Sequence, residues 1–168
     1  MKKLLFSLLV FAIPAMAMQN PQGIKRKYED QRASSITYTK PDISREIFSI
    51  KALDNNHEVG SCQAGVNPFA EHQGYIYALH VESQYRNKGI AYMLFKKGIE
   101  ALIKKNYRVI AWDAIGIFDV STRTLENIYL SMIMKLQQNF EFDFIMEERI
   151  KPLDTEVTPM RIILKGKR

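Results

Sequence analysis

Residues 75–105 read YIYALHVESQYRNKGIAYMLFKKGIEALIKK, and this stretch decides the fold. Its first part is aromatic and branched, which predicts a strand over Tyr75–Val81. From Gly89 onward the apolar residues recur every three or four positions, which predicts an amphipathic helix over Gly89–Lys105. A further strand is predicted directly afterwards, over Tyr107–Trp112. A strand, a helix and a strand in this order favour a parallel strand pair joined by a crossover helix.

Two residues of the predicted helix have special backbone roles. Gly98 lies on the apolar face, where glycine costs about 1 kcal/mol of helix propensity relative to alanine. We expect this cost to be offset because a residue without a side chain lets the helix approach the sheet closely. Asn106 follows the helix, and asparagine tolerates the left-handed backbone that often ends one.

Further elements are predicted on both sides of this unit. Upstream, two strands form a hairpin around the turn at residues 54–56, because Asp and Asn tolerate left-handed backbone; a loop then runs from Asn67 to Gly74. Downstream, a second amphipathic helix with a weak cap signal at Thr124 extends to Leu136. The remaining predicted strands are Glu46–Leu53, Glu58–Val66, Phe140–Met146 and Pro159–Leu164. The predicted fold class is α/β (α+β), with a mixed, mostly antiparallel sheet, a central parallel strand–helix–strand unit, and helices packed on its faces.

The composition is that of one ordinary globular domain. The chain has 168 residues, of which 46% are hydrophobic and 25% charged, so it is long enough for a core and short for two domains. The single cysteine, Cys62, excludes a disulfide within the chain and a cysteine-built zinc site, and no metal site is predicted.

The amino terminus has the order of parts that is typical of a secretory signal peptide. Lys2 and Lys3 precede an apolar run, Leu4–Ile13, and the triplet Ala15-Met16-Ala17 has a small residue at each end. The run is too short to span about 30 Å of hydrocarbon, and it lacks the polar face of a surface helix. We therefore expect cleavage after Ala17 and an exported protein, periplasmic or secreted, with no membrane span in the mature chain.

The charge of the chain fits a small anionic ligand. The net charge is +6, and two of these charges leave with the predicted signal peptide. A mild positive excess suits an anionic small molecule or an envelope surface and does not indicate nucleic acid. After the signal peptide at 1–17, we expect a polar lead-in or short helix over 18–43 and one domain over 44–168.

The loop at residues 82–91, between the strand and the helix, carries the chemistry. The first backbone N–H groups of a helix have no partner within the helix, and the helix dipole adds partial positive charge there. Such an end binds phosphate well. Gly89 has no side chain to block an anion, and Arg86 and Lys88 add positive charge. These residues indicate a pyrophosphate site, with an ordinary connecting loop carrying solvated basic residues as the alternative.

This region resembles the acyl-CoA-binding motif of the GNAT acetyltransferase superfamily. The motif reads Q/R-x-x-G-x-G/A at a strand-to-helix junction, and Arg86, Gly89 and Ala91 occupy its three defined positions. The resemblance covers residues 44–164. It implies acetyl-CoA or another acyl-CoA as cosubstrate, with the pyrophosphate on the loop and the thioester in a gap between Tyr75–Val81 and Tyr107–Trp112. The residues implied to bind it are Leu79, Val81, Arg86, Asn87, Lys88, Gly89, Ile90, Ala91 and Asn127.

The second helix matches the family pattern only in part. The family carries an Asn and a Tyr there and ends the helix in Gly-Phe, and here Asn127 matches the Asn while the ending is Asn139-Phe140. Lys135 stands where the Tyr is expected. Tyr129, on the same helix, is the candidate proton donor to the departing CoA thiolate, with a core aromatic role as the alternative.

A general base is harder to assign. Acyl transfer to an amine needs a neutral nucleophile, which a base near neutral pKa provides directly or through water. His80 titrates in this range, although strand alternation turns it away from the face of its two neighbours. Asp113 and Glu82 lie near strand ends. Each fits the role of general base no better than that of an ordinary loop carboxylate. Tyr75 and Tyr77 stand where some family members have a Glu.

Two functions follow from these residues. One is an acyl-CoA-dependent N-acyltransferase, in the simplest case an N-acetyltransferase, that acts by direct attack of an unidentified amine. Direct attack is expected because Cys62 has no evident base and no nucleophilic serine motif occurs. The alternative is a catalytically silent GNAT-like module that binds a ligand or partner outside the cytosol. The phosphate loop favours the enzyme, whereas the unmatched helix tyrosine and the export signal favour the silent module.

The signal peptide can be tested directly. We expect protein recovered from the cell envelope or the medium to begin at Met18, because cleavage follows the Ala15-Met16-Ala17 triplet. Intact-mass and amino-terminal mass spectrometry check this. A cytosolic protein that retains Lys2 and Leu4 would contradict it.

Overall fold

The computed structural model describes residues 35–115, 121–148, 150 and 156–165. The predicted signal peptide and most of the predicted lead-in therefore lie outside the described residues. In the described part of the chain, no helix is both long and apolar enough to cross a membrane.

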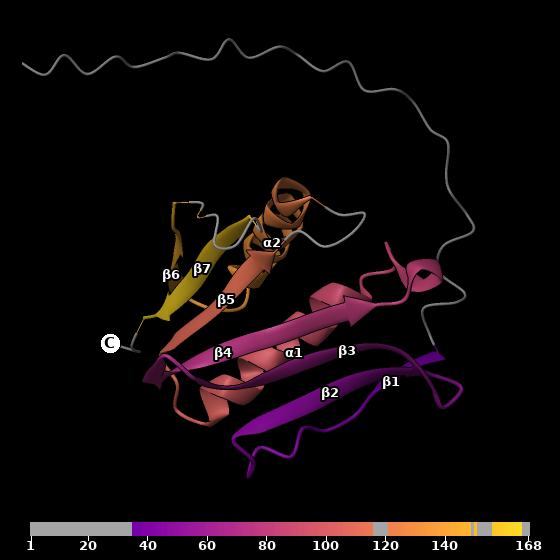
Figure 1. Ribbon diagram of the computed structural model, residues 1–168. Helices are drawn as coiled ribbons and strands as arrows, with labels where there is room; N and C mark the ends of the chain where they lie inside the picture. The colour runs from indigo at the N-terminus through magenta and orange to yellow at the C-terminus, as the bar shows by residue number, and fades with distance from the viewer. Residues whose placement is uncertain (1–34, 116–120, 149, 151–155, 166–168) are drawn as a thin grey trace, which may run out of the picture.

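Seven strands form one sheet in the order β1-β2-β3-β4-β5-β7-β6 (Figure 1). All neighbours are antiparallel except β4 and β5, which are parallel. This confirms the predicted mixed, mostly antiparallel sheet. The strands are β1 (Ile36–Tyr38), β2 (Ile47–Asp54), β3 (His57–Asn67), β4 (Ala70–Val81), β5 (Val109–Ile115), β6 (Phe142–Met146) and β7 (Val157–Leu164). The helices are the short 3-10 helix η2 (Ser83–Tyr85), α1 (Ile90–Lys104) and α2 (Thr122–Leu136).

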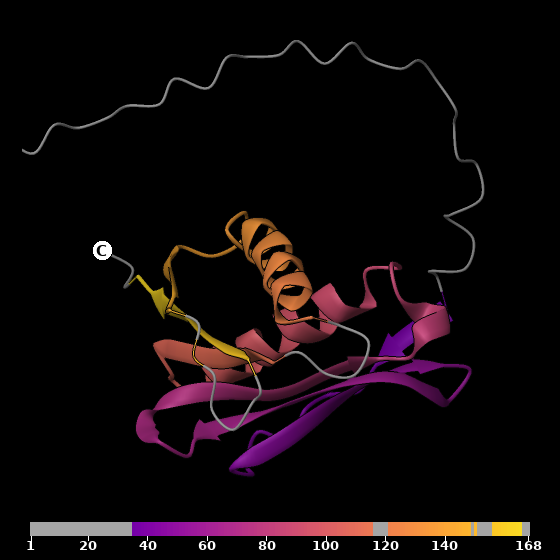
Figure 2. The ribbon, with the colours of Figure 1, turned by 45° about the horizontal axis from the view of Figure 1, so that its top comes forward.

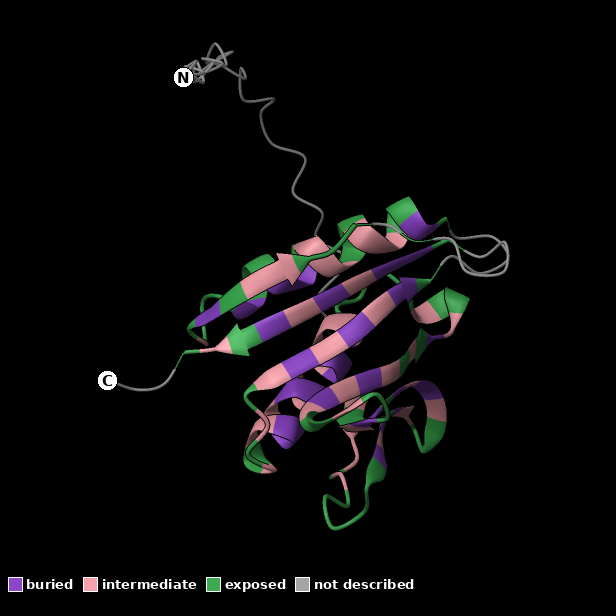
Figure 3. Ribbon diagram, turned by 60° about the vertical axis from the view of Figure 1, so that its left-hand side comes forward, coloured by how far each residue is buried: buried purple, intermediate pink, exposed green. Residues whose placement is uncertain are grey.

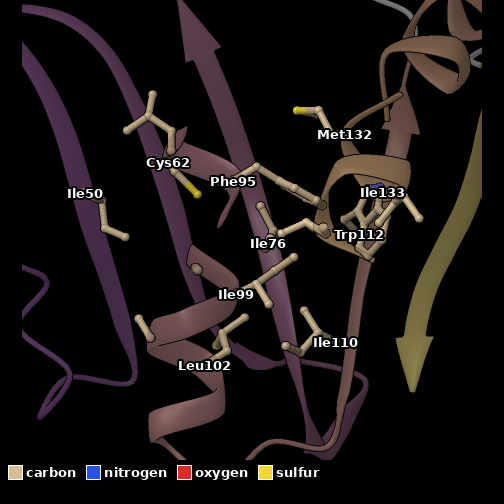
Figure 4. Close-up of a cluster of buried hydrophobic side chains, with 14 of the residues drawn as sticks. Ile50, Cys62, Ile76, Phe95, Ile99, Leu102, Ile110, Trp112, Met132 and Ile133 are labelled. Atoms are coloured by element: carbon tan, nitrogen blue, oxygen red, sulfur yellow. The ribbon is translucent and has the colours of Figure 1, made fainter. Parts of the chain in front are cut away.

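Both α-helices lie on the same side of the sheet (Figure 2). They meet at Trp112 of β5, whose ring centroid is 5.1 Å from that of Phe95 on α1 and 5.8 Å from that of Tyr129 on α2. Phe144 of β6 stacks on the same indole at 6.3 Å. The core therefore lies between one face of the sheet and the two helices, and Figure 4 shows Phe95 and Trp112 within it.

The close approach expected at Gly98 is present. A Cβ atom at this position would lie 3.0 Å from the Cys62 sulfur of β3 and 3.8 Å from Ile76 of β4. Glycine therefore lets α1 settle directly on the sheet. Asn106 ends the helix with a φ of 66°, which confirms its predicted left-handed conformation.

Burial alternates along the strands, as a sheet with one covered face requires (Figure 3). On β2, the buried residues Phe48, Ile50 and Ala52 face the helices, and the residues between them face the other side. Asn55 and Asn56 make the turn to β3 with φ values of 48° and 68°, as the sequence predicts. The opposite face of the sheet carries no described helix, and it is called the open face below.

The loop predicted at residues 67–74 is wrong. The loop expected from Asn67 to Gly74 is a tight turn, because β4 already begins at Ala70 and pairs with β3 there. The side chain of Asn67 makes this possible by accepting a hydrogen bond from the Phe69 N–H at 2.9 Å. Residues 36–38, within the predicted lead-in over 18–43, form the strand β1, which pairs with β2.

The predicted cap of α2 is also wrong. The side chain that caps α2 is Ser121, which accepts a hydrogen bond from the Thr124 N–H, so the cap lies three residues before the predicted one. Asn139 is not among the described residues with positive φ. After α2, the Asn139 and Phe140 N–H groups instead bond to the Leu136 carbonyl at 2.8 Å and 3.0 Å.

Leu94 tests the orientation of α1. It is fully buried, and replacing a buried leucine by alanine costs about 2–5 kcal/mol through lost burial and a residual cavity. We expect Leu94→Ala to lower the free energy of unfolding by this amount in chemical denaturation. Lys104→Ala, at an exposed position of the same helix, is the control. A loss below about 0.5 kcal/mol for Leu94→Ala would mean that this face is not core.

Candidate functional site

The two parallel strands separate after a short paired region. β4 and β5 pair only from Gln73↔Val109 to Ile76↔Trp112. Beyond that point β4 continues to Val81 and β5 to Ile115 without pairing to each other. Figure 1 shows the two strands diverging. The splay that the family resemblance implied is therefore present, and along the gap β4 has an edge to which no described strand pairs.

A β-bulge marks the point of divergence. Gln63 pairs with Ala78 and Ala64 with Ile76, so Tyr77 is an extra residue on β4. Bulges bend a strand and re-aim its side chains. Past the bulge, Leu79 pairs with Cys62 and lies on the helix side, and Val81 is buried. Both residues predicted to contact a pantetheine arm thus lie on the part of β4 that leaves β5.

The predicted phosphate loop ends in unpartnered helix amides. Gly89 is the N-cap of α1 in the left-handed conformation, with a φ of 77°, and no side chain caps the helix. A Cβ atom at Gly89 would meet nothing within 4 Å, so open space lies beside these amides. An anion fits both the geometry and the partial charge.

The rest of the loop is held in place from within. The Arg86 Nε donates to the Val81 carbonyl oxygen at 3.2 Å, which ties the loop to the end of β4. Asn87 has a φ of 62°, and the Lys88 ammonium lies 4.8 Å from the centroid of the Tyr85 ring. Arg86 therefore has a structural contact in addition to its positive charge, which the sequence did not indicate.

A pocket of about 690 Å³ lies beside the loop. Lys88, Gly89 and Ile90 form one wall, and β1, β2 and the turn after it contribute Ile36, Asp54 and others. The Tyr85 hydroxyl donates to Asp54 Oδ2 at 3.0 Å and so joins the two walls. The pocket gives a ligand at the start of α1 room to extend toward β1.

Tyr129, the candidate proton donor, faces the gap region from the helix side. Its ring packs on Phe95 at 5.5 Å and on Trp112 at 5.8 Å. Burial raises the pKa of its phenol, and the nearby Cys62 and Asp113 raise it further. The phenol thus stays protonated at neutral pH, as a proton donor must. The packing of Tyr129 fits both the proton-donor role and the role of a core aromatic residue.

Asp113 and Tyr75 form a pair that sequence reasoning did not predict. Tyr75 lies one residue before the last β4–β5 pair and Asp113 one residue after it, and the Tyr75 hydroxyl donates to Asp113 Oδ2 at 2.5 Å. Burial and this carboxylate raise the pKa of Tyr75. The pair bridges the two strands on the open face, where the gap begins. The two residues are 38 positions apart in the sequence. Their contact could therefore be predicted only from the register in which β4 and β5 pair.

The other predicted residues lie away from this pair. His80 is exposed on β4, on the side opposite to its neighbours Leu79 and Val81, as strand alternation predicted. Asn127 is exposed on α2. The Lys135 ammonium lies 5.6 Å from the centroid of the Tyr92 ring, so it bridges α2 and α1. Glu82 accepts from Gln84 and lies 3.3 Å from the His57 ring nitrogen.

Cys62 has the environment of an inert thiol. It is fully buried, and burial raises its pKa to about 12. A thiol that stays protonated at neutral pH is a poor nucleophile. The described residues contain no group of three or more His, Cys, Asp or Glu side chains that would hold a metal ion.

The splayed parallel pair, the bulge and the glycine-capped helix define the fold of an N-acetyltransferase of the GNAT type. The model of the Acetyltransferase (GNAT) family matches residues 16–118 of this chain, and the chain belongs to this family. No curated protein matches the sequence significantly.

Solved structures share the fold at low sequence identity. A GNAT-family protein from Desulfovibrio desulfuricans aligns with a TM-score of 0.54 and 13% identity, over 70% of this chain and 69% of its own. A protein from Bacillus anthracis, described as a streptothricin acetyltransferase and solved with acetyl coenzyme A, gives a TM-score of 0.53 and 13% identity over 72% of this chain and 64% of its own. The diaminobutyrate acetyltransferase of Paenibacillus lautus, solved with L-2,4-diaminobutyric acid and coenzyme A, gives 0.52 and 16% over 69% of each chain.

Proposed function

We propose that this protein is an acyl-CoA-dependent N-acyltransferase, with acetyl-CoA as its acyl donor. The observation that carries the proposal is the pair of features at the end of β4. The strand leaves its parallel partner after Ile76, and the chain then enters α1 through Gly89, with uncapped amides and open space beside them. The first feature exposes a free strand edge, and the second provides a site for phosphate.

The chain's own residues fit a donor that extends from one feature to the other. The backbone amides at the start of α1 would hold the pyrophosphate, with Lys88 adding positive charge beside them. The free edge of β4 at Leu79–Val81 would hydrogen-bond the amides of the pantetheine arm, as an added strand does. When bound, acyl-CoA supplies an acyl group activated as a thioester. The Bacillus anthracis structure with acetyl coenzyme A shares this fold.

Direct attack by the acceptor amine fits the described residues better than an acyl-enzyme. Cys62 is buried and protonated. Direct transfer relies mainly on positioning, and holding two reactants in near-attack geometry supplies about 7–11 kcal/mol. The amine nitrogen gains the acyl group and loses a proton to solvent, while the carbon–sulfur bond breaks and the sulfur gains a proton from a donor that solvent then reprotonates. Tyr129 is our candidate donor of that proton, because its raised pKa keeps the phenol protonated.

The silent GNAT-like module remains our second candidate. The position where the family has its helix tyrosine is Lys135, whose ammonium contacts the Tyr92 ring. We also retain the proposal that the chain is exported. Acyl-CoA is a cytosolic metabolite, so an exported protein without transferase activity would fit this second function. Acetyl transfer to an amine by the purified protein decides between the two.

The phosphate loop can be tested by substitution at Gly89. Gly89→Glu places an anion in the space beside the helix amides, so we expect it to abolish the rise in melting temperature that CoA produces. Any side chain there has to adopt a φ of 77°, which costs about 1–2 kcal/mol. Gly89→Asn is the matched control, because asparagine tolerates this conformation and carries no charge. An unchanged CoA-induced shift in Gly89→Glu would falsify the placement of the pyrophosphate.

Direct attack makes a prediction for Cys62. We expect no acetyl adduct on the intact protein after incubation with acetyl-CoA in the absence of an acceptor, because the thiol is buried and protonated. Cys62→Ser is expected to retain acetyl transfer to within about threefold, since the sulfur takes no part in the chemistry. Intact-mass spectrometry and a CoA-release assay measure both effects. An acetyl group trapped on Cys62 would overturn this mechanism.

A further inference from the structure

The loop at residues 82–91 is attached to the turn after β2 by two side-chain contacts. The Tyr85 hydroxyl donates to Asp54 Oδ2 at 3.0 Å, and the His57 ring nitrogen lies 3.3 Å from Glu82 Oε1. Asp54 and His57 pair with each other across this turn. The proposed phosphate loop therefore rests on a hairpin from an earlier part of the sequence, since Tyr85 and Asp54 are 31 positions apart.

The carboxylate of Asp54 is fixed by the sheet and not by the loop. Its Oδ1 accepts hydrogen bonds from Ser35 Oγ at 3.0 Å and from Asn55 Nδ2 at 3.2 Å. Its backbone pairs with that of Ile36 on β1. These contacts leave Oδ2 to accept from the Tyr85 hydroxyl. Asp54 thus offers Tyr85 an acceptor whose position is set by β1, β2 and the turn that follows.

The ring of Tyr85 holds the Lys88 ammonium. Lys88 Nζ lies 4.8 Å from the centroid of this ring, which is within the range of cation–π attraction. No described carboxylate lies within ion-pair distance of Lys88. The two parts of the Tyr85 side chain therefore have separate contacts, the hydroxyl with Asp54 and the ring with Lys88. Together these contacts connect the end of β2 to the start of α1.

These contacts end beside the helix amides that would hold a phosphate. Lys88 directly precedes Gly89, the N-cap of α1, and both line the same pocket as Tyr85. The other basic side chain of the loop, Arg86, is bonded through Nε to the Val81 carbonyl oxygen. A free lysine side chain loses rotamer freedom when it binds an anion, and this loss weakens binding. A ring that already holds the ammonium reduces the loss, which is preorganisation.

We propose that Tyr85 and Asp54 are positioning residues for the acyl donor. Tyr85 holds the Lys88 ammonium beside the amides at the start of α1, and Asp54 holds Tyr85. This inference rests on the proposed N-acyltransferase function and adds residues outside the Arg86–Ala91 motif that set the affinity for the phosphates of CoA. Tyr85 acts on the donor through Lys88, and Asp54 acts through Tyr85. The effect is on binding of the donor and not on the transfer step.

A double-mutant cycle tests whether Tyr85 acts through Lys88. CoA is titrated by calorimetry into the whole protein and its variants. We expect Tyr85→Leu to weaken CoA binding about fivefold through loss of the cation–π contact, and Lys88→Met to weaken it at least about tenfold through loss of the charge. In the Lys88→Met background, Tyr85→Leu is expected to add less than about twofold, because no ammonium is left to hold. A merely structural tyrosine would weaken binding equally in both backgrounds.

A second set of variants tests the hydrogen bond between Tyr85 and Asp54. Tyr85→Phe keeps the ring and Asp54→Ala removes the acceptor, and we expect each to weaken CoA binding about threefold. The two together are expected to cost no more than either alone, because both break the same bond. Asp54→Asn keeps an acceptor oxygen, so its CoA affinity should stay within about twofold of the unaltered protein. Asp54→Ala also removes a negative charge near the phosphates, so tighter CoA binding in that variant would overturn the role of Asp54.

Controls and a kinetic measurement complete the test. Tyr107→Leu makes the same change at the other end of α1, and its CoA affinity is expected to be unchanged. Melting temperatures verify that each variant is folded, and Tyr85→Phe gives the result if Tyr85→Leu does not fold. If acetyl transfer occurs, we expect Tyr85→Leu to raise KM for acetyl-CoA with little effect on kcat, because the lost contact is a binding contact. KM for S-acetylpantetheine, which has no phosphates, should not change.

The outcomes separate this inference from the proposed function. Unaltered CoA affinity in folded Tyr85→Leu, or an equal loss with and without Lys88, would overturn the positioning role while CoA binding itself stands. If the unaltered protein does not bind CoA, the proposed function fails and this inference fails with it. CoA binding that follows the expected pattern without any acetyl transfer would support the positioning role and favour the silent module.

Discussion

The packing around Trp112 is the constraint on which the rest of the structure depends. Trp112 is the last residue of β5 that pairs with β4, and its buried ring contacts α1 through Phe95, α2 through Tyr129 and β6 through Phe144. One side chain therefore fixes where both helices lie and supports the sheet at the point where it divides. Its indole N–H has no hydrogen-bond partner in the described structure, which costs free energy that the aromatic packing has to offset. The gap, the free edge of β4 and the placement of Tyr129 all follow from this junction.

The central unit was predictable because its signals are local. Helical periodicity, the capping glycine and the strand composition all lie within residues 75–105, and the structure has α1 within one residue of the predicted bounds at each end. Asn55, Asn56 and Asn106 were predictable for the same reason, since each adopts left-handed backbone that asparagine tolerates. The close approach at Gly98 was also predictable, because glycine on an apolar helix face indicates that a neighbouring element lies close to the helix.

Several omissions depend on partners far away in the sequence, whereas the errors at the Asn67 turn and the Ser121 cap concern local contacts. β1 has only three residues, and it becomes a strand by pairing with β2. The bulge at Tyr77 depends on how β3 and β4 align, and no residue type in the sequence indicates it. The Tyr75–Asp113 bond requires the parallel register of two strands that α1 separates. The sequence thus indicated the position of the candidate phosphate loop but not the contact of Arg86 with the Val81 carbonyl oxygen, and it indicated Asp113 only as one carboxylate among several.

The arrangement of the sheet also has a consequence for the order of folding. Strands β1 to β4 pair in sequence order through short connections, and α1 follows at once and covers them. The other side of the sheet has to bring β7 back to β5 across α2 and β6, which requires closing a much longer loop and is intrinsically slower. We therefore expect the contacts among β1 to β4 and α1 to form before β7 pairs with β5. β5 then adds to the edge of β4 only along Gln73–Ile76, where the two strands pair.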